Sequence, residues 1–272
     1  MDHTLRSLGI NSDWNFTLIF SGLIMTRLSL MTTIVPFLVG KPVPSSIKMG
    51  FTVVMLIFLY PFLAPADHSL LPQGLLPIMT LFFKEAFYGI TLAFAASIVF
   101  HAFEAAGGMV DNQRGAAQAR LLIPQLGEQS SLFGNFNYLL GIVIFLHLGG
   151  HLLFLKAFFE SYEVLPILSF PKMRPDFLLM TDEIIRMTGV ILILSIQLSA
   201  PVLITIFIVD VILGLISKAA PSINVWELGF AVRGVLGVFI YFLSLGLIMS
   251  QMSKLSLGMV DDLQKLIHHL AL

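Results

Sequence analysis

The amino-acid sequence predicts an all-α integral membrane protein with about six long hydrophobic helices, several of them kinked. The composition is the first reason: 57% of the 272 residues are hydrophobic, 11% are charged, and the mean hydropathy is +0.93. A soluble domain is about 45–50% apolar and about 25% charged. The second reason is that no alternating strand pattern is visible, and backbone groups in lipid must be satisfied internally.

The apolar residues fall into six segments that are long enough to span a bilayer as helices, which takes roughly 20 residues. They cover residues 14–39, 47–64, 77–103, 132–159, 188–216 and 228–249. The first ends at a turn that contains Pro42 and Pro44, since two prolines in three residues cannot continue a helix. The second ends at prolines, and polar linkers follow both the second and the fourth. The linker at 160–187 is the longer one.

The last two segments carry further signals. Pro201 is expected to break the fifth segment, and a turn around Pro221 and Asn224 precedes the sixth. Residues 250–272 are expected to form a short amphipathic helix, because apolar residues recur there at helical spacing. We expect residues 1–272 to form one membrane-embedded domain without a separate soluble part.

Charge and cysteine content exclude several function classes. A net charge of −1 gives no basic surface for nucleic acid, and the absence of cysteine excludes thiol nucleophiles and Cys-ligated metals. No Ser-His-Asp order or phosphate loop can be assembled, and the adjacent pair Lys84 and Glu85 is expected to point to different sides of its helix. We therefore expect neither an enzyme nor a cofactor.

A polar stretch at residues 104–131 interrupts the apolar sequence between the third and fourth segments. This polar island holds five charges, while both of its flanks are long and apolar. Gly107 and Gly108 permit a break or sharp bend at its start, and the polar run at 111–114 is followed by Gly115. An ordinary solvated loop is one interpretation. The other is a structured element that faces an aqueous path, since irregular backbone at membrane depth is tolerated where it lines water.

Other polar residues lie within the apolar segments. Asp210 is a candidate functional residue, because an acid within a membrane helix is costly and is kept mainly where it has a function. The alternative is that it forms a structural ion pair with Arg233 or Arg27. Six charged residues lie inside the apolar segments: Arg27, Lys84, Glu85, Lys156, Asp210 and Arg233. Basic residues are also divided nearly equally between the two sides of six simple spans, so the positive-inside rule predicts no orientation.

Two spacing patterns remain. Gly89, Ala93 and Ser97 place three small residues on one helix face, which favours close helix packing. His147 and His151 have the i, i+4 spacing of a zinc pair, but no Asp or Glu is spaced nearby as a third ligand, so we expect interfacial or core histidines and no metal.

Three stretches together resemble the FliR/SctT family of type III secretion export-apparatus proteins. They are KEAFYGITLAFAASIVFHAFEAAGGMVDNQRGA (84–116), SAPVLITIFIVDVILGLISKAAPSINVWELGF (199–230) and TRLSLMTTIVPFLVGKPVPSSIKMGF (26–51). The resemblance extends from about residue 20 to 250. The sequence of residues 111–116 is closer to that of the injectisome branch than to that of the flagellar branch.

The resemblance implies a non-enzymatic subunit of the export gate in the bacterial inner membrane, which conducts unfolded polypeptides. It implies FliP/SctR-like, FliQ/SctS-like and FlhB/SctU-like partners, with helices that sit largely in that assembly. It also implies a pore plug at about Gly107 to Gln129. The plug positions that match the motif are Asp111, Asn112, Gln113 and Arg114, while Pro201, Asp210, Pro221 and Asn224 match a C-terminal motif of structural or subunit contacts. An ion- or proton-coupled transporter that uses Asp210 is the alternative.

Overall fold

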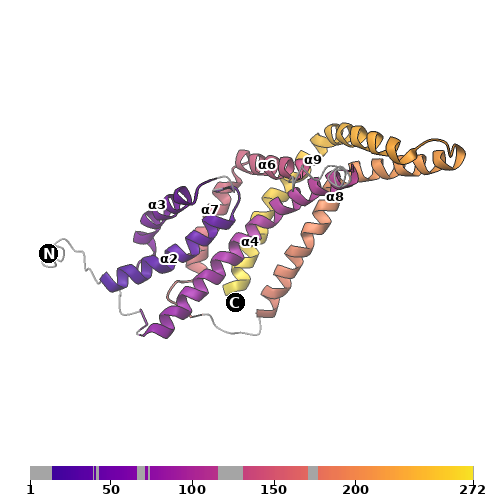
Figure 1. The fold of residues 1–272 in the computed structure, drawn as a ribbon. Coiled ribbons are helices and arrows are strands. Elements are labelled where there is room, and N and C mark those ends of the chain that lie inside the picture. The colour runs from indigo at the N-terminus through magenta and orange to yellow at the C-terminus, as the bar shows by residue number, and fades with distance from the viewer. Residues whose placement is uncertain are drawn as a thin grey trace. The chain divides into compact units, whose positions relative to one another are not determined.

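All regular secondary structure in the described part of the chain is α-helical, as predicted. The computed structural model describes residues 14–38, 40, 43–65, 71–72, 74–115, 131–170 and 177–271. The helices are α2 (Trp14–Ile34), α3 (Ser45–Leu63), α4 (Leu75–Gln113), α6 (Leu132–His147), α7 (Gly150–Val164), α8 (Phe177–Ala219) and α9 (Val225–Ala271) (Figure 1). Five of them are long and apolar enough to cross a membrane, or six if α6 and α7 count as one broken span.

Several helices are longer than the sequence predicted. Helix α4 continues through Gly107 and Gly108, where we expected a break, and α8 continues through Pro201. Proline removes one helical hydrogen bond, but a helix that ended inside an apolar segment would leave several backbone groups unpaired. The predicted C-terminal tail is helical but is not a separate element, because α9 runs without interruption through it to Ala271.

The fourth predicted segment is two helices rather than one. Helix α6 ends at His147, and Gly149 follows with a φ of 72°, a left-handed conformation that glycine adopts without strain. Helix α7 begins at Gly150. His147 and His151 therefore lie on different helices, so the i, i+4 geometry that motivated a metal pair is absent.

The chain divides into two compact units. The first comprises residues 1–97, 151–182 and 260–272, and the second comprises residues 98–150 and 183–259. Helices α4 and α9 each contribute one part to each unit.

In the first unit, α2 and the N-terminal part of α4 approach closely. A Cβ atom on Gly89 would lie 3.0 Å from the backbone oxygen of Arg27 and 3.2 Å from the Cβ atom of Leu30. Ala93 and Ser97, on the following turns of α4, are buried.

In the last part of α9, Met259, Leu263 and Leu266 are buried at helical spacing, which gives this part of the helix one apolar face.

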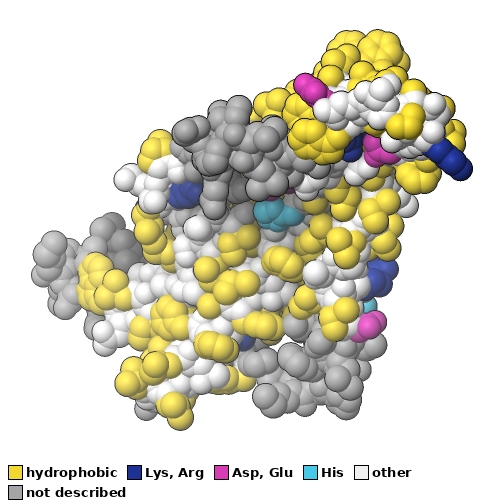
Figure 2. All heavy atoms as spheres, turned by 45° about the vertical axis from the view of Figure 1, so that its right-hand side comes forward, with side chains coloured by type: hydrophobic (Ala, Val, Ile, Leu, Met, Phe, Trp, Pro, Cys, Tyr) yellow, Lys and Arg dark blue, Asp and Glu magenta, His cyan; other side chains and the backbone are white. Residues whose placement is uncertain are grey.

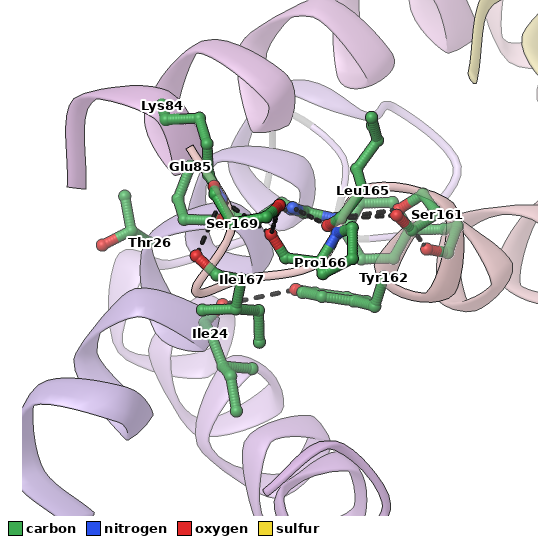
Figure 3. Close-up of polar contacts among 12 residues, drawn as sticks. Ile24, Thr26, Lys84, Glu85, Ser161, Tyr162, Leu165, Pro166, Ile167 and Ser169 are labelled. Atoms are coloured by element: carbon green, nitrogen blue, oxygen red, sulfur yellow. Dashed lines mark hydrogen bonds and ion pairs between the residues drawn. The ribbon is translucent and has the colours of Figure 1, made fainter. Parts of the chain in front are cut away.

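The first unit also buries two cations around one carboxylate (Figure 3). Glu85 accepts a hydrogen bond from Arg27 Nε at 2.7 Å through Oε2, and its Oε1 lies 2.9 Å from Lys84 Nζ. The side chains of Arg27 and Glu85 are fully buried, and that of Lys84 is 4% exposed. The expectation that Lys84 and Glu85 point to different sides is wrong, because the long lysine side chain bends back to its neighbour.

The two cations of this cluster also hold the end of α7. Arg27 donates to Ser161 O at 3.2 Å and to Leu165 O at 3.0 Å, and its guanidinium carbon lies 4.2 Å from the ring centre of Tyr162. Lys84 donates to three backbone carbonyls at 2.7–3.0 Å, those of Pro166, Ile167 and Ser169. Carbonyls at a helix C-terminus lack helical partners and favour cations. The cluster therefore joins α2 and α4 to the turn after α7.

Glu85→Gln should destabilise the protein by about 3–5 kcal/mol, because it leaves two buried cations without their counter-charge. Glu160→Gln is the matched control, since Glu160 and Lys156 form an exposed pair at 3.8 Å and the same substitution there should cost less than about 0.5 kcal/mol. Unfolding of the purified protein in detergent measures both. Equal effects of the two substitutions would contradict the assigned role of Glu85.

Candidate functional site

In the second unit, the carboxylate of Asp111, in the last turn of α4, lies within the polar island and contacts its last residue, Ser131. Asp111 Oδ2 accepts hydrogen bonds from Ser131 Oγ at 2.6 Å and from the backbone N–H of Phe133 at 2.9 Å. Its side chain is only 6% exposed. Ser131 is the N-cap of α6, and its Oγ accepts from the N–H of Gly134 at 2.9 Å. Asp111 thereby places a negative charge at the N-terminus of α6, where the helix dipole stabilises it.

Arg114, in the turn after α4, connects this carboxylate to α9. Its Nη1 lies 3.4 Å from Asp111 Oδ1, and its Nε donates to the backbone oxygen of Gly234 at 3.3 Å. The guanidinium carbon lies 4.8 Å from the ring centre of Phe133, a cation–π distance. Gly115 follows with a φ of 94°, so the chain leaves the helix through a glycine-type turn.

Aromatic packing supports the same region from α6 and α9. The ring of Phe133 meets that of Tyr241 edge to face at 4.4 Å between centres, and the Tyr241 hydroxyl bonds to the side chain of Asn137. Asp111, Arg114, Ser131 and Phe133 form what we call the neck, the place where the chain leaves α4 and enters α6.

Gly107 has a packing role rather than the bending role we expected. A Cβ atom there would collide with the backbone carbonyl of Phe133, so only glycine allows α4 and the start of α6 to lie this close. Gly108 is less constrained, since the nearest atom to a Cβ there is Ser131 Oγ at 3.9 Å. The expectation of a break at Gly107 and Gly108 is therefore wrong because close helix contact, and not chain reversal, requires the glycine.

The structure brings some of the predicted plug residues into the neck and separates others from it. Asp111 and Arg114 belong to the neck and Gly107 packs against the backbone of Phe133, whereas the side chain of Asn112 is exposed and that of Gln113 is half-buried. Residues 116–130, which include the remainder of the predicted plug, lie outside the described residues. Both oxygens of Asp111 face donors, so the arrangement is suited to holding two chain segments together.

The predicted C-terminal residues lie on α8 and in the turn that joins it to α9, and the two helices form an antiparallel pair (Figure 1). Asp210 Oδ1 lies 3.6 Å from Arg233 Nε, which decides between the two pairings considered above, because Arg27 bonds to Glu85 instead. Asn224 Oδ1 accepts from the N–H of Glu227 at 3.4 Å at the start of α9, and Pro221 lies in the turn before it. Pro201 lies within α8, about two turns before Asp210.

The outer surface of this helical pair is apolar. Figure 2 shows hydrophobic side chains in patches over much of the described surface in view, with a few charged side chains between them. The exposed residues include Phe207, Ile208, Val211, Leu215, Trp226, Val235, Phe239 and Phe242. Asp210 and Arg233 are 37% and 23% exposed within this surface. At ~1.5 Å per residue they lie roughly 13 Å along each helix from the turn.

Several residues of these sites were not predicted. Ser131 directly precedes an apolar run, which is the signature of a helix N-cap, and this signal was available in the sequence. No local pattern indicates Gly234, because its role depends on which residue lies beside its carbonyl oxygen. The same holds for the carbonyls of residues 165–169 that bind Arg27 and Lys84.

Comparison with known proteins identifies the family. The model of the family described as bacterial export proteins, family 1, matches residues 18–259. The chain is 33% identical over 246 residues to Yop proteins translocation protein T of Yersinia pestis, which covers 90% of this chain and 93% of the relative.

More distant relatives come from two kinds of system. The chain is 32% identical over 163 residues to surface presentation of antigens protein SpaR of Shigella sonnei, covering 60% of this chain and 61% of the relative. It is 28% identical over 222 residues to flagellar biosynthetic protein FliR of Bacillus subtilis, covering 78% and 80%. The chain therefore belongs to the bacterial export proteins, family 1, as its resemblance to FliR/SctT proteins predicted.

Proposed function

We propose that this protein is a subunit of the type III secretion export gate and helps to form the channel for unfolded polypeptides. The observation that carries this proposal is the family match over residues 18–259, together with relatives named for translocation and for flagellar biosynthesis. With five or six long apolar helices, the chain is a multi-pass protein of the bacterial inner membrane. Its role in the gate is structural rather than enzymatic.

The partners we propose are FliP/SctR-like, FliQ/SctS-like and FlhB/SctU-like membrane subunits. The surface of α8 and α9 supports a protein partner there rather than lipid alone. A charge in the middle of a membrane helix is costly, and Asp210 and Arg233, although they pair with each other, are both partly exposed within this apolar surface. A partner helix with a polar side chain at the same level would cover the pair.

We propose that the segment from Gly107 to Gln129 contains the plug that closes the channel at rest. The geometry of the neck supports this, because Asp111, near the start of the segment, bonds to Ser131 and Phe133, just beyond its end. A segment anchored at one place can be displaced as a unit while the helices on either side keep their packing. The part that enters the channel begins after Arg114 and Gly115.

The transporter alternative is not favoured. Asp210 faces Arg233 at 3.6 Å, which satisfies its charge within the chain, and the family is one of export proteins.

Deletion of residues 110–122 should make the assembled gate leak ions, because it removes both the neck anchor and the first part of the plug. The measurement is the conductance of purified complexes, containing the two smaller helical subunits, in planar bilayers. The control replaces residues 119–122 with a glycine-serine stretch of equal length, which leaves the neck intact and should leak less. Conductance equal to that of the unmodified gate after the deletion would reject the plug.

Asp210→Arg should reduce co-purification of the partner subunits. The double variant Asp210→Arg, Arg233→Asp restores an ion pair within the chain but presents reversed charges outward. If partners contact this pair, the double variant should still capture them several-fold less well than the unmodified protein. Full recovery in the double variant would show that the pair acts only inside the chain.

A further inference from the structure

The side chain of Arg114 lies against the surface of α9 at a position where Gly237 has no side chain. A Cβ atom on Gly237 would overlap Arg114 Cγ, would lie 2.7 Å from Cδ and would lie 3.3 Å from Nε. One helical turn earlier, the carbonyl of Gly234 accepts the Nε hydrogen bond at 3.3 Å. The aliphatic part of Arg114 thus crosses α9 where a side chain is missing, and its polar part reaches a backbone oxygen. We call Gly234 and Gly237 the arginine seat.

Only one of the two glycines needs to lack a side chain for Arg114 to fit. A Cβ atom on Gly234 would meet no atom within 4 Å, whereas a Cβ atom on Gly237 would strike the middle of the arginine side chain. The absence of a side chain matters at Gly237 alone, and only because Arg114 is there. Glycine inside a helix costs about 0.5–1 kcal/mol relative to alanine, so helix propensity does not explain why glycine stands at position 237.

The other contacts of Arg114 show what the seat positions. The same guanidinium group faces Asp111 Oδ1 at 3.4 Å and the ring of Phe133 at 4.8 Å. Asp111 in turn bonds to the N-terminus of α6. The guanidinium group therefore contacts three elements at once: the end of α4, the start of α6 and one turn of α9.

We infer that Arg114 is a positioning residue that ties the neck to α9 through the arginine seat. In the gate proposed above, on which this extension rests, the resting position of the neck would then depend on the position of α9. Val235 and Val238, which neighbour the seat in sequence on α9, are exposed on its surface. A subunit that covers that surface would act on the same turn of α9 that holds Arg114.

Gly237→Ala should displace Arg114 and loosen the neck, whereas Gly234→Ala, the same substitution three residues earlier on the same helix, should not. The measurement is amide hydrogen exchange of residues 107–115 and 131–137 in the purified complex, which reports local opening. We expect exchange about tenfold faster or more in Gly237→Ala, the size expected for one overpacked contact, and unchanged in Gly234→Ala.

Arg114→Ala provides the second arm, because it removes the atoms that the new Cβ would strike. On the Arg114→Ala background, Gly237→Ala should have no further effect on exchange. Unchanged exchange in Gly237→Ala, or equal effects of Gly237→Ala with and without Arg114, would overturn the inference. This readout does not depend on whether the segment closes a channel, so a non-leaking deletion would reject the plug and leave the seat standing.

Discussion

The rest of the structure depends on a single constraint: an apolar chain can bury a carboxylate only where donors from several helices surround it. Glu85 meets Arg27 and Lys84, and Asp111 meets Ser131, the amide of Phe133 and Arg114. Each acid lies on α4, one in each compact unit. Because removing any partner leaves an unsatisfied buried group, each acid specifies which segments lie around α4. Within each unit, apolar packing holds the helices together, and the acid determines which segments contact its part of α4.

Hydropathy predicted most of the helices but predicted their ends poorly. It located every apolar segment, because a membrane helix needs roughly 20 apolar residues. The ends were wrong where glycine and proline had roles other than breaking the helix: Gly107 admits the backbone of Phe133, and Pro201 lies within a helix that continues past it. Whether a glycine bends a chain or receives a neighbour is decided by tertiary contacts, and these are absent from a local pattern.

The candidate site shows the same division. Asp111 and Arg114 stood out in the sequence because charges are rare in such a chain, and both are in the neck. Ser131 could have been recognised from its position before an apolar run, but Gly237 could not. Through Arg114, the neck connects the polar island to α9, which together with α8 exposes an apolar surface. In the proposed gate, these surfaces receive other subunits, and the neck conveys their arrangement to the plug.

The most direct test of this account is a cross-link across the neck. The chain has no cysteine, and the Ser131 Oγ atom is the nearest atom to a Cβ atom on Gly108, at 3.9 Å, so cysteines at these two positions would face each other across the neck. The variant Gly108→Cys, Ser131→Cys should form a disulfide readily in assembled gates under mild oxidation. The control Gly108→Cys, Leu132→Cys should not, because Leu132 is exposed. Absence of the Gly108–Ser131 cross-link in assembled gates would contradict the neck on which the account depends.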